Sequence, residues 1–202
     1  MSSYKHICIS AVCGLLVALC VAVAGFQADC TAIRENTFRL HIIANSDSAD
    51  DQNIKLAVRD AIQVLAEDLY EKCENQEQAK KQTVLNLKNF ETKANEVLQA
   101  AGFAYTATAM VGTVSFNTRE YEDFTLPAGE YEALEIVLGA GQGKNWWCVM
   151  YPKVCFSTCS EDFDSVLEER QQEIVTDRKK YRVAFRMVEI FDDVKRFFKK
   201  YL

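Results

Sequence analysis

Residues 38–70 read FRLHIIANSDSADDQNIKLAVRDAIQVLAEDLY, and this stretch decides the fold. Its first part, residues 38–45, alternates side chains with a period of two, which is typical of a strand. The Asn, Ser and Asp side chains at residues 45–48 can accept hydrogen bonds from the free N–H groups of a helix start. Apolar residues then recur every three or four positions through residues 49–70, which predicts an amphipathic helix with one buried face. A strand that leads directly into such a helix indicates a domain in which helices pack on a sheet.

The remaining patterns extend this architecture along the chain. A second amphipathic helix is predicted at residues 77–101 and ends at Gly102. Strands are expected at residues 105–116, 131–138 and 146–151, a helix at 163–175, a final strand at 181–188 and a basic amphipathic helix at 190–202. This order of elements predicts an α+β fold, a single domain with a mainly antiparallel or mixed sheet covered by helices.

The N-terminal segment differs in composition from the rest of the chain. A basic start precedes residues 7–26, which carry no charge, and small residues follow the apolar centre. This is the three-part pattern of a secretory signal peptide, with cleavage expected after Ala24. The run is also long enough to be a retained anchor, since the hydrocarbon core of a bilayer is about 30 Å thick. The sequence therefore divides into residues 1–24, a signal peptide or membrane anchor, and residues 25–202, one exported domain.

The charge distribution restricts the classes of partner. The chain has a formal net charge of −6 at pH 7. An acidic chain is a poor candidate for binding nucleic acid, whose phosphates require a basic face. Basic residues gather at the C-terminal end, where Lys195, Arg196, Lys199 and Lys200 flank two phenylalanines. Such a pattern is more often a terminal helix whose apolar side docks on the domain, and the competing interpretation is transient contact with a membrane surface.

The cysteines suggest one disulfide. Residues 25–202 contain Cys30, Cys73, Cys148, Cys155 and Cys159. An odd number leaves at least one of them outside any intramolecular disulfide, provided that the compartment is oxidising. A disulfide between Cys148 and Cys155 would close a short loop and contribute about 2–3 kcal/mol on the chain-entropy estimate.

Candidate catalytic groups are few. A cysteine nucleophile usually needs a histidine to take its proton, and His41 is the only histidine of residues 25–202. We expect His41 to be solvated on the outer side of its strand. The spacing of the cysteines matches no common zinc site, so neither a metal nor a cofactor is expected. An exported cell-wall or peptide hydrolase that uses Cys148 or a pair of carboxylates is the alternative function.

Both tryptophans of the chain lie in residues 143–155, GKNWWCVMYPKVC. Neighbouring residues of a strand point to opposite faces of its sheet, so Trp146 and Trp147 cannot be buried by the same face. Either both faces are covered at this place, or one indole stays partly exposed and available to a partner.

Two stretches resemble the signature regions of the stage II sporulation protein R family. They are residues 39–60, RLHIIANSDSADDQNIKLAVRD, and residues 127–156, PAGEYEALEIVLGAGQGKNWWCVMYPKVCF. The matching positions are Ile43, Ala44, Asn45, Ser46, Asp47, Ser48, Pro127, Gly129, Glu130, Tyr131, Glu132, Ala133, Leu134, Asn145, Trp146, Trp147, Cys148, Pro152 and Cys155. The chain departs from the family pattern in its glycine run, GAGQG, and at Lys153, which follows Pro152 where the family pattern has a second proline.

The resemblance implies a signalling protein and not an enzyme. It implies export by the forespore of an endospore-forming bacterium into the space between its two membranes. There the protein is expected to activate a membrane-embedded aspartic protease of the mother cell, which removes the pro-sequence of a mother-cell sigma factor. The family offers no catalytic residue to carry over, so the resemblance predicts only residues that contact the partner. They are Asn45, Ser46, Asp47, Ser48, Glu130, Tyr131, Asn145, Trp146 and Trp147.

Overall fold

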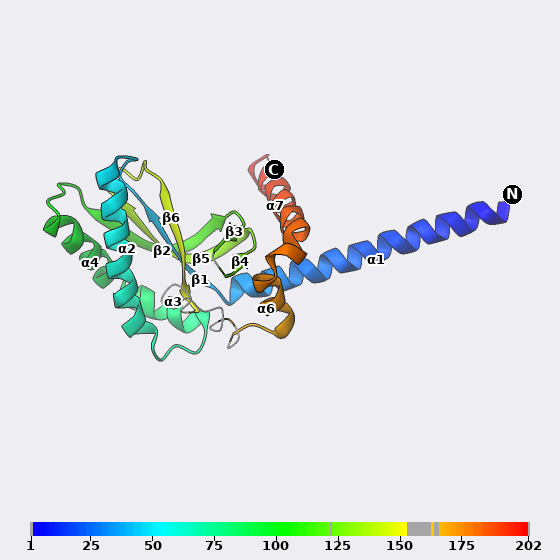
Figure 1. Ribbon diagram of the computed structural model, residues 1–202, viewed down its shortest axis with the longest axis horizontal. Helices are drawn as coiled ribbons and strands as arrows, with labels where there is room; N and C mark the ends of the chain where they lie inside the picture. The colour runs from blue at the N-terminus through cyan, green and yellow to red at the C-terminus, as the bar shows by residue number, and fades with distance from the viewer. Residues whose placement is uncertain (1, 122, 153–162, 164–165, 202) are drawn as a thin grey trace.

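The centre of the fold is a four-stranded sheet in the order β2-β5-β1-β6. The computed structural model describes residues 2–121, 123–152, 163 and 166–201. The strands are β1 (Phe38–Ile43), β2 (Ala107–Phe116), β5 (Gly129–Leu138) and β6 (Asn145–Tyr151). β1 pairs in parallel with β5, whereas β1 with β6 and β2 with β5 pair antiparallel. The predicted α+β fold with a mixed sheet is confirmed (Figure 1).

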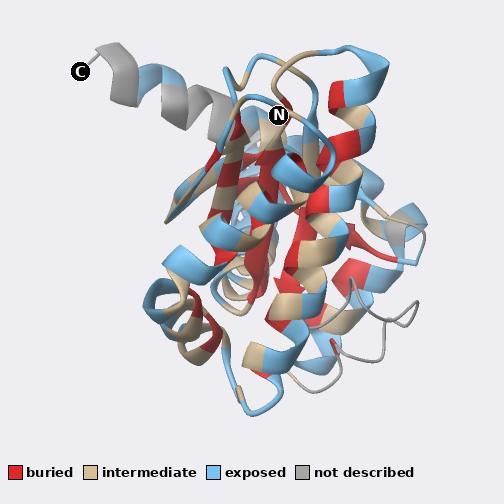
Figure 2. Ribbon diagram, turned by 90° about the vertical axis from the view of Figure 1, so that its left-hand side faces the viewer, coloured by how far each residue is buried: buried red, intermediate tan, exposed pale blue. Residues whose placement is uncertain are grey.

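One face of the sheet is covered by α2 (Ala49–Tyr70), α3 (Gln76–Leu85) and α4 (Leu87–Ala100). Leu40 and Ile42 of β1 point to this face and are fully buried, as are Val58 and Ile62 of α2. The apolar side chains that alternate in β1 and those that recur every three or four residues in α2 therefore pack in one core. Figure 2 shows the buried residues concentrated in the strands and on the sides of the helices that face them.

The single helix predicted over residues 77–101 is in fact two helices. Asn86 stands between α3 and α4 with φ −109° and ψ 15°, outside the helical range, and ends α3 through bonds from its N–H to the carbonyls of Gln82 and Thr83. Asparagine tolerates this role because its short polar side chain also bonds locally, here from Nδ2 to the Gln82 carbonyl at 2.9 Å. The break allows the two helices to follow different directions over the sheet (Figure 1).

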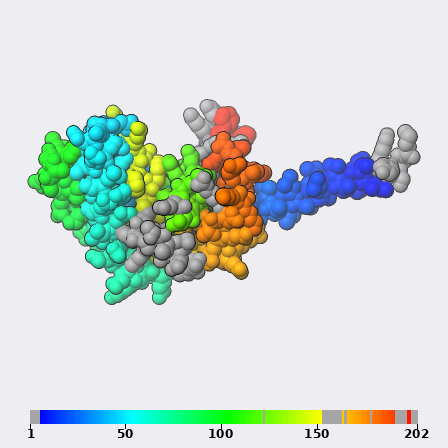
Figure 3. All heavy atoms as spheres, viewed as in Figure 1, coloured from blue at the N-terminus to red at the C-terminus, as the bar shows by residue number. Residues whose placement is uncertain are grey.

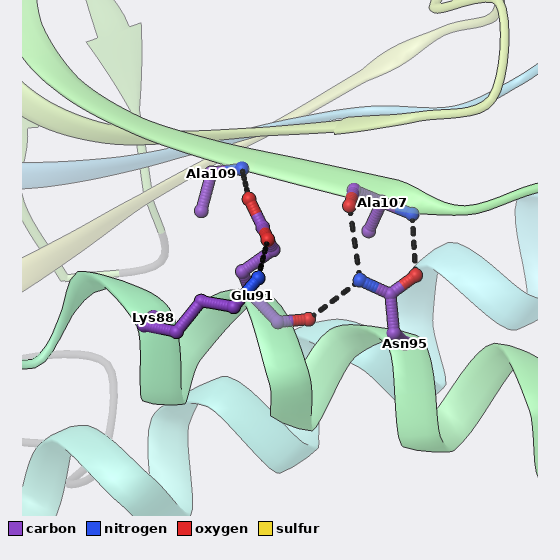
Figure 4. Close-up of polar contacts among 5 residues, drawn as sticks. All are labelled: Lys88, Glu91, Asn95, Ala107 and Ala109. Atoms are coloured by element: carbon purple, nitrogen blue, oxygen red, sulfur yellow. Dashed lines mark hydrogen bonds and ion pairs between the residues drawn. The ribbon is translucent and has the colours of Figure 1, made fainter.

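Side chains of α4 cover part of the outer edge of β2 (Figure 4). Asn95 exchanges two hydrogen bonds with the backbone of Ala107, at 2.8 and 3.0 Å, and Glu91 accepts one from the Ala109 N–H at 3.4 Å. Lys88 Nζ forms an ion pair with Glu91 Oε1 at 2.6 Å. An unpaired strand edge invites another chain to pair with it, so α4 protects this end of the sheet edge.

The other face of the sheet carries a second, smaller core. It is built by α1 (Ser2–Glu35), the two short strands β3 (Arg119–Glu120) and β4 (Thr125–Leu126), α6 (Glu169–Thr176) and α7 (Arg178–Tyr201). The buried residues of this core are Ile33, Phe124, Leu126, Val149, Phe163, Leu167, Ile174, Val175 and Phe185. The β3–β4 hairpin was not predicted, because its strands are too short to show a period.

The N-terminal apolar run continues into the domain as one helix. α1 leaves the body of the molecule and carries exposed apolar residues along its first part (Figures 1 and 3). Its last turns are different, because Cys30 and Ile33 are fully buried. The helix fits an export segment, and the cleavage expected after Ala24 would fall inside it.

The final strand predicted at residues 181–188 is wrong, because these residues belong to α7. Ala184 and Val188 interrupt the polar side of the apparent alternation. Phe185 and Val188 are buried and Tyr181 is half-buried, and this spacing of four and three is that of one helix face. The helix predicted at residues 163–175 is also shorter than expected, since α6 begins at Glu169.

Candidate partner-binding site

The two signature stretches are distant in the sequence but meet at one end of the sheet. β1 and β5 are parallel, so both end there, and antiparallel β6 begins there. Residues 44–48 follow β1, and residues 139–145 lead from β5 into β6. We call these two segments together the motif end.

Backbone bonds fasten the two segments of the motif end to each other. The Gly143 N–H donates to the Ala44 carbonyl at 2.8 Å, and the Gln142 N–H donates to the Asn45 carbonyl at 3.1 Å. A β-carbon on Gly143 would lie 2.2 Å from the Ser46 carbonyl oxygen. A glycine is therefore required at position 143 by a close approach of two backbones.

Side chains of the first segment complete this attachment. Asn45 Oδ1 accepts from the Ala140 N–H at 2.9 Å, and Asp47 Oδ1 accepts from the Lys144 N–H at 2.7 Å. Ser48 is the N-cap of α2 and accepts from the Asp51 N–H at 3.2 Å. The predicted capping cluster is thus confirmed, and its members also position the second segment.

Asp51 is the centre of the polar network at the motif end. Its carboxylate accepts hydrogen bonds from Ser46 Oγ at 2.5 Å, Tyr105 OH at 2.5 Å and Asn45 Nδ2 at 2.9 Å. The bonds from Ser46 and Tyr105 outweigh burial and lower the pKa of Asp51 to about 2. The carboxylate is therefore ionised at neutral pH and stabilises both segments through Asn45 and Ser46.

Lys55 supplies a cation to the same network. Its ammonium group is buried and donates to Gln52 Oε1 at 2.6 Å and to the Lys144 carbonyl at 2.9 Å. Burial lowers the pKa of Lys55, and the nearby Asp47 carboxylate opposes this shift. Sequence reasoning missed Lys55, although its place one turn after Asp51 puts both on the same side of α2.

Trp146 and Trp147 lie on opposite faces of edge strand β6, as strand geometry predicts. Arg59 of α2 lies over the Trp146 ring, with its guanidinium carbon 4.4 Å from the ring centroid. Trp147 stacks on His41 at 3.8 Å between ring centroids and meets Phe116 edge-on at 4.7 Å. Both indoles are half-buried, so each keeps some surface for a partner.

The prediction that His41 is solvated is wrong, and Arg39, on the same side of β1, is buried as well. Arg39 is fully buried, and its guanidinium carbon lies 3.9 Å from the Phe116 centroid and 4.8 Å from that of Tyr131. It also donates to the hydroxyl of Tyr121. His41 is buried too, with Nδ1 2.7 Å from Glu135 Oε2, and burial lowers the pKa of His41 although Glu135 opposes the shift. The alternation of side chains along β1 could not predict this burial, because the elements that cover Arg39 and His41 are distant in the sequence.

Residues 34–161 match a protein-family model described as stage II sporulation protein R. This match covers more than half of the chain. The chain belongs to the stage II sporulation protein R family. It is also similar to the stage II sporulation protein R of Bacillus subtilis (strain 168), with 35% identity over 141 residues, which are 70% of this chain and 62% of that relative. No solved structure matches the chain.

Membership of the stage II sporulation protein R family supports a role in sporulation. The matched residues 34–161 include the whole sheet, α2 to α4 and both segments of the motif end, and they end before α6 and α7. The contacts that join the two signature stretches therefore lie within the part of the chain that defines the family.

The family's matching positions differ in what they offer a partner. Asp47, Ser48, Glu130 and Asn145 are exposed, whereas Asn45 and Ser46 are half-buried. Tyr131 is only 1% exposed and donates its hydroxyl proton to the Pro127 carbonyl at 2.6 Å. Glu130 and Tyr131 also begin β5 and thus lie at the opposite end of the sheet from the motif end. The motif end and the tryptophans are therefore the more accessible half of the predicted surface.

The geometry does not support a cysteine–histidine pair. Leu40 pairs with Cys148 and His41 with Trp147, so the Cys148 and His41 side chains lie on opposite faces of the sheet. Cys148 is buried in the main core, with Sγ 3.5 Å from Gln63 Nε2. Cys155 and Cys159 lie outside the described residues, and the Cys148–Cys155 disulfide stays a prediction. Within the described part of the chain, no group of three or more His, Cys, Asp or Glu side chains is arranged to hold a metal ion.

Proposed function

We propose that this protein is an exported activating ligand of a membrane-embedded aspartic protease of the mother cell. The activated protease then removes the pro-sequence of a mother-cell sigma factor. Family membership and the N-terminal apolar helix support this proposal. The protein would cross the forespore membrane into the intermembrane space, where α1 either leaves as a signal peptide or stays as an anchor.

One observation carries the proposal at the level of residues. The two signature stretches share a single exposed end, in which intramolecular bonds hold the loops in one conformation. A prearranged surface loses little conformational entropy when it binds, and a half-exposed tryptophan beside it is a typical anchor of an interface. The contact surface proposed for the protease therefore comprises Asp47, Ser48, Lys144, Asn145 and Trp147.

The alternative, an exported cell-wall or peptide hydrolase, has weaker support. Cys148 faces away from the only histidine of residues 25–202, and the Asp51 carboxylate has its oxygens occupied by three hydrogen bonds. A disulfide from Cys148 to Cys155 suits an exported protein better than a thiol nucleophile does. We therefore include this disulfide in the proposal as a stabilising element.

Substitution of an exposed residue of the motif end tests the proposal. Asn145→Arg places a bulky charge on the proposed contact surface, so we expect sigma-factor processing to fall at least about tenfold, the equivalent of about 1.4 kcal/mol in binding. The substitution also removes the hydrogen bond between the Asn145 and His41 side chains, so thermal unfolding of the variant must match that of the wild type. Val64→Arg, at a 65% exposed position of α2 about four turns from the motif end, is the matched control and should process normally. Both variants must accumulate to the wild-type level. Normal processing with Asn145→Arg, or an equal loss with both variants, would contradict the proposed surface.

A further inference from the structure

The junction of α1 and α7 bears on how the domain sits relative to a membrane. Among the described helices, the part of α1 from His6 to Glu35 is long and apolar enough to cross a bilayer, a test that a signal sequence also passes. Its apolar run ends at Phe26, just before the turns of α1 that are buried in the domain. If α1 stays in the membrane, the residues around Phe26 lie at the membrane surface.

α7 contacts α1 at this place. The ring of Phe26 stacks on Tyr181 with 5.8 Å between centroids and meets Phe185 edge-on at 5.9 Å. Figure 1 shows α7 running across the direction of α1 and away from the domain. A helix that crosses a membrane-spanning helix in this way, at the level where the span ends, runs along the membrane surface.

The outer side of α7 has the composition of an interfacial helix. Tyr181, Phe185 and Val188 face the molecule, but Val183, Met187 and Ile190 are 71%, 47% and 55% exposed. Phe197 and Phe198 continue the exposed apolar side further along the helix. The spacing of four and three between the first exposed residues places them on one stripe, which nothing in the described chain covers.

The charge of α7 favours an anionic surface. Its sequence contains nine basic and three acidic residues, a net charge of +6, although the whole chain has a net charge of −6. Anionic headgroups attract such a segment, whereas a second copy of this helix would be repelled by its like charge. An apolar stripe within a basic helix is the pattern that lies in the headgroup layer of a bilayer.

We propose that α7 lies in the surface of an anionic lipid membrane, beside the point where α1 enters it. The arrangement holds the domain at a defined height and orientation, with two membrane contacts in place of one flexible anchor. The inference depends on retention of α1 and not on activation of a protease, so its failure and that of the proposed function are separate results.

Bromolipid quenching of an added tryptophan tests this placement in the full-length chain. The Met187→Trp variant is reconstituted into vesicles of phosphatidylglycerol and phosphatidylcholine whose acyl chains carry bromine near the headgroup. Subtraction of the wild-type signal removes Trp146 and Trp147. We expect the added fluorescence to fall by roughly half or more, with weaker quenching when phosphatidylglycerol is omitted. Gln99→Trp, on exposed α4, is the matched control and should show no quenching of its added signal.

These measurements distinguish a membrane from another partner on the exposed stripe of α7. Quenching that is equal at positions 187 and 99, or absent at both, would overturn the proposal. So would cross-linking of one chain to another through a photoreactive side chain placed at position 187. Circular dichroism of both variants must match the wild type, and because Met187 is exposed the new indole should not disturb the fold.

Discussion

Replacing Asp51 by asparagine should uncouple the two segments of the motif end. The carboxylate accepts from Ser46, Tyr105 and Asn45, and Asn45 in turn holds the glycine run through the Ala140 N–H. An asparagine keeps the volume but replaces one acceptor oxygen by an NH2 group, which faces donors. Neutralisation also weakens the remaining bonds, because hydrogen bonds to a charged group are stronger than neutral ones.

The pKa of Asp51 gives the size of this effect. A carboxylate whose pKa falls from 3.8 to about 2 on folding contributes, before screening by solvent, about 2.5 kcal/mol to the free energy of unfolding. Because solvent at this end of the sheet screens part of that interaction, we expect Asp51→Asn to lower the free energy of unfolding by about 1–2 kcal/mol at pH 7. The folded-state pKa lies below the unfolded value. The contribution is therefore complete above about pH 4 and is lost as the pH falls through 2.

Urea unfolding between pH 7 and pH 2 measures this contribution. The difference between wild type and Asp51→Asn should shrink as the pH falls from 4 to 2. Asp50→Asn removes the same charge from an exposed position of the same helix turn, so it should change the free energy of unfolding by less than about 0.5 kcal/mol. Equal effects of the two substitutions, or a difference that stays constant down to pH 2, would refute the central role of Asp51.

Three further predictions concern the same sheet. Gly143→Ala should lower the free energy of unfolding, measured by thermal unfolding, by about 1–3 kcal/mol, because the added β-carbon would lie 2.2 Å from a backbone oxygen. Gly112→Ala, whose β-carbon would have no atom within 4 Å, should lower it by less than about 1 kcal/mol. Similar losses for the two variants would exclude the close approach. Burial lowers the pKa of His41, so this histidine binds a proton more readily in the unfolded chain than in the folded one. The free energy of unfolding should therefore fall as the pH drops below about 6.5. A His41→Gln variant whose free energy of unfolding changes with pH as the wild type's does between pH 7 and 5 would disprove this. Under non-reducing conditions Cys148→Ser and Cys155→Ser should each lose about 2–3 kcal/mol, and an effect of Cys148→Ser alone would count against a disulfide between them.

The regular patterns of the sequence predicted the main core well. Helix 49–70 is found as α2, with the same bounds, because a capping cluster and a long apolar stripe both define it. The strands at residues 38–45 and 131–138 were predicted within a few residues of β1 and β5. In these elements local propensity and tertiary packing act in the same direction.

The errors have tertiary causes. Residues 181–188 alternate well enough to suggest a strand, but their buried side chains pack on α1 and the second core as a helix face. Arg39 and His41 look like the solvent side of β1, yet aromatic side chains from β2, β5 and β6 cover them. Neither arrangement can be predicted from the local spacing of apolar residues, because the residues that cover these side chains lie far away in the sequence.

The candidate site was partly accessible to sequence reasoning. The resemblance predicted both segments of the motif end, and strand geometry separated Trp146 from Trp147. The bonds from the Lys144 N–H to Asp47 and from Lys55 to the Lys144 carbonyl could not be predicted, since they depend on the parallel pairing of β1 with β5. The same pairing explains why two distant signature stretches lie together at one end of the sheet.

Titration of the purified full-length chain into vesicles that carry the aspartic protease and its pro-sigma-factor substrate tests the activating-ligand function most directly. Processing should rise with added chain and level off when the bound chain reaches a fixed, near-stoichiometric ratio to the protease. The chain without the protease should leave the substrate intact. Cleavage of the substrate by the folded chain alone, or no processing when folded chain, protease and substrate are all present, would contradict the account.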